Sequence, residues 1–586
     1  MSLSRPITLF LLLIACYPSS AAAPDEFQAL LEEVWEWQLN ENPLRASMFG
    51  DRRANDQWDD RSLKAVERRY QEQRSFLSRL QSIDSSRLDA TDQLNYELFR
   101  RDLQDDIDAN KYRTFLMPIS HRGGLQNAET LADRLPLATV RDYEDWLVRL
   151  STIDQMLEQT IDLMKQGREE GYMPPQVLMQ RVPDQLAAQL VEEAAQSPFY
   201  KAFETLPDSF SDADRQRLQE QARTIIDDTV VPAYREFNDY FNETYLPASR
   251  ESVGASELPN GKAYYEYRAR SYTTTQMTPE QIHRLGLEEV ARIRAELQLI
   301  IDELEFDGDF GDFLTFLRTD KQFYHDSPKE LYDAYLAICK RIDPQLVKLF
   351  GKLPRMPYGV RPIPDSIAPD TTTGYYSRPA ADGSRAGYYY VNLYKPEVRP
   401  KYEMEVLSVH EAMPGHHLQI ALQMELPDMP KFRRYSGFTA FTEGWGLYSE
   451  SLGYDLGLYQ DPYARFGALT YDMWRAVRLV VDTGMHYKGW TRQQAIDFFK
   501  DNAAKTELDI VNEIDRYIGN PGQALAYKIG QLRILEIRTK AEATLGADFD
   551  VRAFHDALLG GGALPLELLE TQMNRWLAVE LARLRN

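Results

Sequence analysis

The sequence predicts a mostly α-helical fold, with one large multi-helix body and a single small β-hairpin. Apolar residues recur three and four positions apart through most of the 586 residues, which is the spacing of a helix with one buried face. Strand patterns are few. No repeat of 20 to 50 residues and no long low-complexity linker is present, so we expect the helices to pack together rather than to form separate modules.

Three helices can be delimited from local signals. Residues 146–164 carry one apolar stripe that runs towards Gly171, which predicts a single long amphipathic helix. Residues 278–281, Thr-Pro-Glu-Gln, combine an N-cap, a first-turn proline and a capping-box glutamine, so a second long helix should begin there. Three glycines at 560–562 interrupt the chain, and Pro565 should open the last helix.

The hairpin is expected between residues 374 and 392, where two tyrosine-rich runs flank the turn-like Asp382-Gly383-Ser384. Its second strand ends at Tyr390-Val391-Asn392. A free edge there could receive an extended peptide, which makes Asn392 a candidate substrate-binding residue. Pro, Gly and Thr cluster near residues 250–275 and predict a division into an N-terminal helical half, 24–260, and a C-terminal helical half, 261–586, that holds the chemistry.

Residues 1–23 read as a signal peptide, because a short basic start precedes an apolar run too short to span a bilayer. Leu13-Ile14-Ala15-Cys16 fits the bacterial lipoprotein box, in which an acylated Cys16 becomes the mature N-terminus. The competing cleavage follows Ala23, although Pro24 obstructs it. The sequence therefore predicts export, either as a periplasmic protein or as a lipoprotein anchored to the membrane through Cys16. Cys339 is then left without a disulfide partner.

Composition excludes several classes of protein. Apolar residues make up 43% and charged residues 27%, as in ordinary soluble globular proteins. Lys plus Arg number 67 against 90 Asp plus Glu, a formal net charge of −23. A phosphate backbone would be repelled by that charge, so nucleic acid is not an expected partner. The oligomeric state cannot be read from the sequence.

A histidine cluster indicates where the chemistry lies. Four of the eight histidines fall between residues 410 and 486, where even scattering would put about one. The densest segment is His410-Glu411-Ala412-Met413-Pro414-Gly415-His416-His417. Zinc peptidases place two histidines four apart on one helix, with a glutamate after the first that serves as general base. Here Pro414 must open the helix, and we expect His410 and His416 to be ligands, with His417 as the alternative to His416 and Glu411 as the base.

The third ligand is expected in the acidic helical segment Phe441-Thr442-Glu443-Gly444-Trp445-Gly446. Two histidine nitrogens, one Glu443 oxygen and a water would make the open four-coordinate site that catalytic zinc needs. Glu450, two turns further on, could orient a histidine ligand instead. One Zn²⁺ ion is therefore the expected cofactor, although His and carboxylate ligands also accept manganese or cobalt.

Several segments in one order resemble a large bacterial family known as domain of unknown function 885. They are His410-Glu411-x-x-Pro414-Gly415-His416-His417, Glu443-Gly444-Trp445, Arg478-x-Val480-Val481-Asp482-Thr483-Gly484-Met485-His486 and Arg516-Tyr517-x-x-x-Pro521-Gly522-Gln523-Ala524-Leu525-x-Tyr527. The resemblance runs from about residue 25 to the end. It implies a zinc metallopeptidase with a helical fold similar to the gluzincin peptidases and a deep cleft over the metal. It implies no particular substrate.

The later segments suggest further catalytic roles. Arg478, Asp482 and His486 recur every four residues, which is either a salt-bridged surface stripe or a face on which Asp482 holds His486 towards the substrate oxyanion. Tyr527 is the other expected oxyanion donor, as a tyrosine is in related gluzincins. Arg516 is a candidate for binding a substrate carboxylate by two parallel hydrogen bonds, and Tyr517 could fill either role.

Together these observations predict an exported zinc metallopeptidase that hydrolyses oligopeptides in the cell envelope. Two alternatives remain. A zinc amidohydrolase acting on a non-peptide amide would use the same metal chemistry. A non-catalytic helical lipoprotein that binds peptides or scaffolds partners would have no need of Glu411, since a structural zinc site is closed by a fourth protein ligand.

Overall fold

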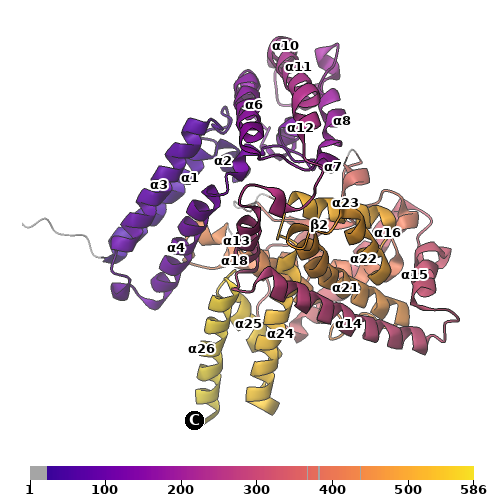
Figure 1. Cartoon of the computed structure of the whole chain (residues 1–586). Coiled ribbons are helices and arrows are strands. Elements are labelled where there is room, and N and C mark those ends of the chain that lie inside the picture. The colour runs from indigo at the N-terminus through magenta and orange to yellow at the C-terminus, as the bar shows by residue number, and fades with distance from the viewer. Residues whose placement is uncertain (1–22, 366, 381–382, 384, 436, 586) are drawn as a thin grey trace, which may run out of the picture.

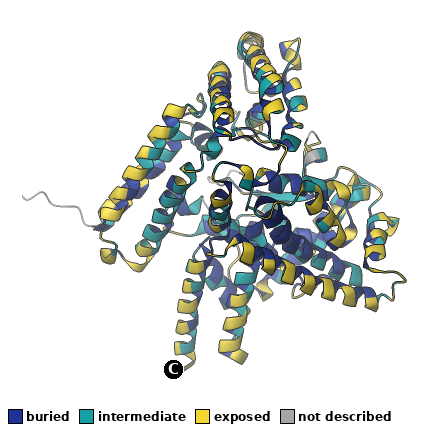
Figure 2. Ribbon diagram, viewed as in Figure 1, coloured by how far each residue is buried: buried dark blue, intermediate teal, exposed yellow. Residues whose placement is uncertain are grey.

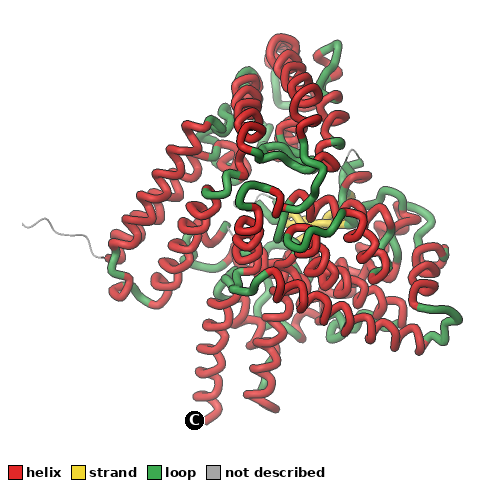
Figure 3. The backbone as a smooth tube through the Cα atoms, viewed as in Figure 1, coloured by secondary structure: helices red, strands yellow, loops and turns green. Residues whose placement is uncertain are grey.

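The computed structural model describes residues 23–365, 367–380, 383, 385–435 and 437–585. The expected signal segment lies outside these residues, Ala23 excepted, and so do Cys16 and most of the predicted hairpin turn. Within the described part the protein is mostly helical, with one small sheet set among the helices (Figure 3), which confirms the predicted fold class.

Helices α1 to α12 form the N-terminal part of the molecule. In Figure 1, α1, α3 and α4 stand together on one side, while α6, α8, α10 and α11 form a second group above the rest. This part contacts the C-terminal part through an ion pair between Arg181 and Asp515, with 2.6 Å between Nη2 and Oδ2. The bounds are α1 Ala23–Glu41, α2 Pro43–Met48, α3 Leu63–Ser82, α4 Ala90–Asn110, α5 Val140–Leu150, α6 Ile153–Glu170, α7 Gln176–Met179, α8 Val182–Ala187, α9 Lys201–Glu204, α10 Asp212–Ile225, α11 Val231–Tyr240 and α12 Leu246–Ala248.

The single helix predicted across residues 146–164 is wrong, because the chain breaks between α5 and α6. The hydroxyl of Ser151 donates to the carbonyl oxygen of Val148 at 2.8 Å, and that of Thr152 donates to the carbonyl oxygen of Arg149 at 3.1 Å. Such local bonds compete with the helical ladder. The apolar stripe continues in phase across the break, so periodicity alone does not reveal it. The end near Gly171 is confirmed, since this glycine follows α6 with φ of 80°.

Helices α13 to α26 build the C-terminal part and surround the sheet. The long α21 is the most deeply buried of them, with other helices of this part around it (Figure 2). The bounds are α13 Gly261–Thr273, α14 Pro279–Glu303, α15 Phe310–Thr319, α16 Pro328–Ile342, α17 Met404–Glu411, α18 His416–Glu425, α19 Lys431–Arg434, α20 Thr439–Ser451, α21 Pro462–His486, α22 Arg492–Asn502, α23 Glu507–Gly519, α24 Leu525–Leu545, α25 Val551–Leu559 and α26 Leu566–Arg585.

Two predicted helix starts are confirmed. Thr278 caps α14, and its side chain and that of Gln281 each bond the other's backbone N–H as a capping box. The glycines at 560–562 separate α25 from α26, which begins directly after Pro565. None of the helices in the described residues is both long and apolar enough to cross a membrane.

The sheet has three strands in the order β1-β3-β2, with bounds β1 Tyr358–Pro362, β2 Gly374–Ser377 and β3 Gly387–Val391. Strands β2 and β3 pair antiparallel, which confirms the predicted hairpin. Strand β1 pairs parallel with the other side of β3, with Tyr358 opposite Gly387. Because β3 is the central strand, the expected free edge at Tyr390-Val391-Asn392 is wrong, and the sheet has its edges at β1 and β2.

Candidate metal centre

The helix that carries His410 ends at Glu411 and a new helix begins at His416. Between them, the N–H of Gly415 donates to the carbonyl oxygen of Val409 at 2.9 Å, so the loop folds back onto the helix it left. A Cβ on Gly415 would lie 1.9 Å from the carbonyl oxygen of His410, which only glycine avoids. The indole of Trp445 on α20 donates to the carbonyl oxygen of Pro414 at 2.9 Å and fixes the loop from outside.

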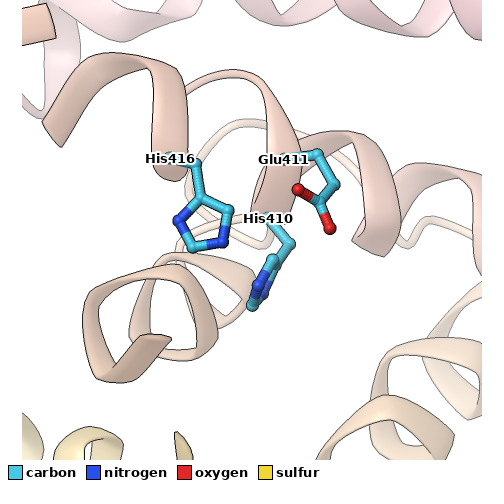
Figure 4. Close-up of side chains that lie close together, drawn as sticks. All are labelled: His410, Glu411 and His416. Carbon is cyan, nitrogen blue, oxygen red and sulfur yellow. The ribbon is translucent and has the colours of Figure 1, made fainter. Parts of the chain in front are cut away.

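This break brings three side chains together. His410 and Glu411 project from the end of α17, and His416 projects from the start of α18 (Figure 4). One ligand atom from each lies within 4.8 Å of the others. The two imidazole rings stand nearly perpendicular, with 4.7 Å between their centroids. The extra residues Pro414 and Gly415 are therefore accommodated by ending one helix and starting another.

Glu443 approaches the same point from α20. Its Oε2 lies 3.6 Å from Nε2 of His410 and 3.4 Å from Nε2 of His416. These separations exceed ordinary hydrogen bonds. Ligand atoms around 2.0–2.1 Å from a tetrahedral zinc lie about 3.4 Å apart, which is the separation found here. Oε2 of Glu443 is buried and has no hydrogen-bond partner among the described residues. The three side chains therefore fit a divalent cation such as zinc.

The charges of these groups shift one another's pKa values. Burial alone would raise the pKa of Glu443, but the imidazoles of His416 and His410 hold it well below its ordinary value. Burial raises the pKa of Glu411, and the two imidazoles oppose the rise. Glu443 is thus kept as a carboxylate, which is the form that binds a cation. Glu411 is shifted towards the range in which a carboxylate can take up and release a proton.

The second nitrogen of His410 is held by Glu450. Nδ1 of His410 and Oε1 of Glu450 are 2.8 Å apart, and Nη2 of Arg475 on α21 lies 3.2 Å from the same oxygen. Glu450 can only accept as a carboxylate, so Nδ1 carries the proton and Nε2 is the nitrogen that faces Glu443. Carboxylates in this position orient histidine ligands of metals. The orienting role considered for Glu450 is thus the arrangement that the structure shows.

The ring of His410 packs against one face of α20. Glu443, Gly446 and Glu450 are three and four residues apart and share this face. A Cβ on Gly446 would lie 2.7 Å from Cε1 of His410, so the ring rests where a side chain would otherwise be. Gly444 serves the other side of the helix, where a Cβ would lie 2.5 Å from Cα of Gly530 on α24.

The close contact between α20 and α24 brings Tyr527 near the site. Tyr527 lies one turn before Gly530 on α24. Burial raises the pKa of its hydroxyl, the charge of Glu443 raises it further, and Arg516 and Arg478 lower it. Cζ of Arg478 lies 4.1 Å from the centroid of its ring. Tyr527 is therefore close enough to Glu443 for their charges to interact, and its role as an oxyanion donor stays a prediction.

His417 points away from the cluster. Its Nδ1 lies 2.9 Å from the hydroxyl of Tyr376 on β2, and its Nε2 lies 3.0 Å from the carbonyl oxygen of Met356. The carbonyl requires a proton on Nε2, so Nδ1 accepts from the tyrosine and both nitrogens are occupied. Loss of hydration lowers the pKa of His417 to about 4 and keeps it neutral. Of the two candidates for the second ligand, only His416 faces Glu443.

The structure does not bring His486 to the metal centre, which corrects the oxyanion role expected for it. Arg475 touches Glu450, and His486 lies eleven residues further along α21, about 16 Å away along the helix axis. Its Nδ1 accepts from the N–H of Ala255 at 3.0 Å, and its Nε2 donates to the carbonyl oxygen of Tyr517 at 3.0 Å. The ring joins three segments of backbone and has no nitrogen left for substrate.

Asp482 does not hold His486 either. Its Oδ1 accepts from the hydroxyl of Tyr265 at 2.5 Å and from the N–H of Gly522 at 3.0 Å. The alternative of a salt-bridged surface stripe is also wrong, because Arg478, Asp482 and His486 are all buried. This face of α21 is covered by neighbouring helices, and its polar groups form hydrogen bonds and ion pairs with neighbouring segments.

Two further candidates have partners of their own. The hydroxyl of Tyr517 donates to Oε2 of Glu513 at 2.7 Å and accepts from Trp474 and Arg478 at 2.9 and 2.8 Å. Nη2 of Arg516 lies 2.9 Å from Oε2 of Glu513. Tyr517 is buried with its hydroxyl fully used, so it is not available to a substrate. Arg516 is paired with Glu513 inside the protein, and its predicted contact with a substrate carboxylate stays a prediction.

Asn392 is a structural residue at the end of β3. Its Nδ2 donates to the carbonyl oxygens of Ala368 and Thr371 at 2.8 and 3.1 Å. Its Oδ1 accepts from the N–H of Tyr394 at 3.0 Å, and the side chain is fully buried. The expected substrate contact is therefore wrong, since the amide closes the corner between the sheet and the preceding loop.

Arg475 was not foreseen from the sequence. It contacts Glu450, while its Cζ lies 4.5 Å from the ring centroids of both Tyr471 and Trp474. The signal available was the spacing Arg475-x-x-Arg478 within residues 473–481, which are otherwise apolar. Charged residues are rarely buried unless they are paired.

Comparison with known proteins agrees with this architecture. A solved structure from Colwellia psychrerythraea, described as a "putative lipoprotein", is 30% identical, with the match covering 95% of this chain and 100% of that one at a TM-score of 0.87. A second, from Shewanella oneidensis and described as a "putative lipoprotein of unknown function", is 17% identical and covers 94% and 100% at a TM-score of 0.74, which shows the shared fold alone. No curated protein matches the sequence. A family model described as "Bacterial protein of unknown function (DUF885)" matches residues 43–573, and the chain belongs to this family.

Proposed function

We propose that the protein is a zinc-dependent metallopeptidase that hydrolyses peptide bonds in oligopeptides. The observation that carries the proposal is the position of Glu443 Oε2, buried and 3.6 and 3.4 Å from the Nε2 atoms of His410 and His416. Two histidines and one glutamate leave a coordination position open for water or substrate. Such a set is typical of catalytic zinc, since structural zinc has four protein ligands.

His410, His416 and Glu443 would hold the zinc ion, which would supply Lewis acidity to polarise a carbonyl group and to make water a nucleophile near neutral pH. Glu411 stands beside these residues with its carboxylate in the same cluster. It takes the proton that the attacking water loses and passes it to the leaving nitrogen.

Three other residues assist the reaction. Tyr527 donates a hydrogen bond to the carbonyl oxygen as negative charge develops on it. Glu450 fixes the tautomer and orientation of His410 through Nδ1, and Arg475 fixes Glu450. The reaction then depends on groups that are held in place before the substrate arrives.

We further propose that the protein is exported from the cytoplasm. Residues 1–23 have the pattern of a signal peptide, and the relative from Colwellia psychrerythraea is described as a "putative lipoprotein". We therefore place the protein in a bacterial envelope, either free in the periplasm or anchored by a lipid on Cys16. Mass spectrometry of the mature N-terminus distinguishes the two, because a lipoprotein begins at an acylated Cys16.

The test of catalysis is digestion of a mixed peptide library by the wild type and by Glu411→Gln. We expect the wild type to cleave peptides, and Glu411→Gln to keep its zinc and lose hydrolysis, because only the proton carrier is removed. Glu397→Gln is the matched control, since Glu397 is exposed and stands in the loop before α17. It should retain full activity.

Each other result excludes a defined part of the proposal. Full activity of Glu411→Gln would remove Glu411 from the mechanism. No cleavage by zinc-loaded wild-type protein would contradict peptidase activity. Hydrolysis confined to non-peptide amides, with loss of activity in Glu411→Gln, would favour the amidohydrolase alternative.

A further inference from the structure

Positive charge accumulates beside Tyr527 in a protein whose net charge is −23. Arg478 on α21 and Arg516 on α23 both pair with one carboxylate oxygen, Oε2 of Glu513, at 3.0 and 2.9 Å. The same oxygen accepts from Tyr517. Nη1 of Arg478 is buried and has no hydrogen-bond partner among the residues that the structure describes. Two guanidinium groups thus share a single negative charge, and one positive charge is left over.

Arg122 adds a third positive charge. It lies in the loop between α4 and α5, which packs against the end of α23, where a Cβ on Gly519 would lie 3.2 Å from Cε1 of His121. A neighbouring ion pair between Arg181 and Asp515 joins the N-terminal part to α23 in the same region. Gly123 and Gly124 follow with φ of 121° and 150°, a conformation that suits glycine alone, so the sequence itself sets the turn that presents Arg122.

The guanidinium of Arg122 has no carboxylate partner in the described part of the chain, and the residue keeps part of its surface in solvent while neighbouring segments cover the rest. Loss of hydration lowers its pKa, the charge of Arg516 lowers it further, and Glu513 and Tyr527 oppose this. An arginine remains charged even so. Like charges held close together without an anion between them are unfavourable, and an anionic ligand relieves the repulsion.

Tyr527 connects this cluster with the metal centre. Its hydroxyl is influenced by Glu443 on one side and by Arg516 and Arg478 on the other. Arg122 is influenced by the same tyrosine. Cζ of Arg478 lies 4.1 Å from the centroid of the Tyr527 ring, and Arg478 shares Glu513 with Arg516. The loop of Arg122 packs at the end of the helix that carries Arg516, so a row of groups runs from the proposed metal ligands through Tyr527 to Arg122. A peptide whose scissile carbonyl faces Tyr527 would extend towards Arg122 with the part of its chain that follows or precedes the cleaved bond.

We propose that Arg122 binds a free carboxylate of the substrate, namely the C-terminal carboxylate of a short peptide cleaved near its end. The planar fork of an arginine matches a carboxylate through two parallel hydrogen bonds. Arg516 behind it adds favourable charge while staying paired with Glu513. This inference rests on the proposed peptidase function and adds to it the class of substrate, peptides with a free C-terminus.

The experiment compares one peptide, Ala-Ala-Phe-Ala, as the free acid and as the C-terminal carboxamide. Hydrolysis is measured with the zinc-loaded wild type, and binding is measured by calorimetry with zinc-loaded Glu411→Gln. We expect the acid to be preferred by about tenfold or more in both assays, the loss typical of a hydrogen-bonded charge left without its partner. Arg122→Gln should bring the ratio close to one, and Arg122→Lys should restore part of it. Arg87→Gln, at an exposed arginine in the N-terminal part, should leave the ratio at the wild-type value.

The outcomes separate this inference from the function on which it rests. Equal use of acid and carboxamide by the wild type, or an unchanged preference in Arg122→Gln, overturns the role of Arg122 while leaving hydrolysis intact. A preference in binding without any hydrolysis supports carboxylate recognition and contradicts the peptidase. Two further peptides, ending in a carboxamide and carrying Glu or Gln as the penultimate residue, test the other source of a carboxylate. Preference for Glu over Gln in these carboxamides would contradict the assignment to the C-terminus.

Discussion

Oε1 of Glu450 lies 2.8 Å from Nδ1 of His410, while the opposite nitrogen of the same ring faces Glu443 at 3.6 Å. One turn of α20 separates each carboxylate from Gly446, and the imidazole lies across that glycine. A single helix face thus provides a proposed metal ligand, the space for a second and the residue that orients it. The seven-residue spacing of Glu443 and Glu450 therefore places both carboxylates on the helix face that His410 contacts.

Replacing Glu450 by Gln should weaken zinc binding by about 10- to 100-fold, as the loss of partners that orient metal-binding histidines usually does. The amide can still accept from His410, but the negative charge that balances Arg475 is lost. Competition with a fluorescent zinc chelator measures the affinity, with Glu397→Gln as control. An unchanged affinity would show that Glu450 has no influence on the site.

Gly446→Ala should reduce both zinc affinity and stability. Its Cβ would lie 2.7 Å from Cε1 of His410, so the ring must move or the helices must separate. Forced overpacking of this kind costs about 1–3 kcal/mol of unfolding free energy. Gly311→Ala on α15 is the control, because there a Cβ meets only a side-chain oxygen of Asp309 at 3.2 Å. Urea unfolding measures both variants, and equal stability of the two would contradict the packing described for His410.

His417→Ala should retain zinc and lose stability. The imidazole joins Tyr376 to the carbonyl oxygen of Met356, and both would be left without their partner inside the protein. Unsatisfied buried groups cost about 1–3 kcal/mol each. Metal analysis and thermal unfolding of this variant decide between the two roles. Loss of zinc at wild-type stability would transfer the role of second ligand from His416 to His417.

Tyr527→Phe should lower kcat by about 100-fold, the usual effect of removing one donor to a developing oxyanion, and leave zinc content unchanged. The ring keeps its packing on Arg478, so folding should be preserved. Steady-state kinetics on a cleaved peptide provide the measurement. Tyr454→Phe, at a half-exposed tyrosine, is the matched control. Normal kcat in Tyr527→Phe would exclude the hydroxyl from the reaction.

Two buried histidines should make stability depend on pH below neutrality. Loss of hydration lowers the pKa of His486 to about 3 and that of His555 to about 4, from an ordinary value of 6.5. Each ring accepts a hydrogen bond on one nitrogen, from the N–H of Ala255 and the hydroxyl of Tyr448 respectively, and protonation there would break it. Their contribution is therefore complete above pH 6.5 and is lost as the pH falls through 6.5 towards 4.

The expected loss is at most about 1.4 kcal/mol per pH unit for each histidine. Urea unfolding at pH 7, 6 and 5 measures it, and His486→Asn and His555→Asn should each flatten the dependence between pH 6.5 and 4. The same slope in the wild type and both variants would show that neither histidine is held neutral by the fold.

The residues of the proposed metal centre could be picked out from the sequence because their signals are local. His410, Glu411 and His416 lie within seven residues of one another. Pro414 indicates the helix break that allows His416 to turn inwards. Glu443 could be proposed from its segment, although its distance from the histidines is a tertiary fact. The start of α14 and the Gly560-Gly561-Gly562 interruption follow equally from local rules of helix capping and glycine.

The failures share a different cause. Periodicity showed that Arg478, Asp482 and His486 lie on one face of a helix, but not that other helices bury this face. Tyr517 and Asn392 were expected to bind substrate because of their chemistry, and the same chemistry serves internal hydrogen bonds. The parallel pairing of β1 with β3 joins residues far apart in the chain, which no local pattern indicates. The position of Arg122 beside α23 could not be predicted, because it depends on the packing of the two parts of the molecule.

The most direct test is a crystal structure of the zinc-loaded protein measured at the zinc absorption edge. We predict one anomalous peak per chain, about 2.0–2.2 Å from Nε2 of His410, Nε2 of His416 and an oxygen of Glu443. The peak should vanish in His416→Ala. A zinc-loaded crystal with no peak between these three side chains, or with its peak at other residues, would contradict the metal centre and the chemistry inferred from it.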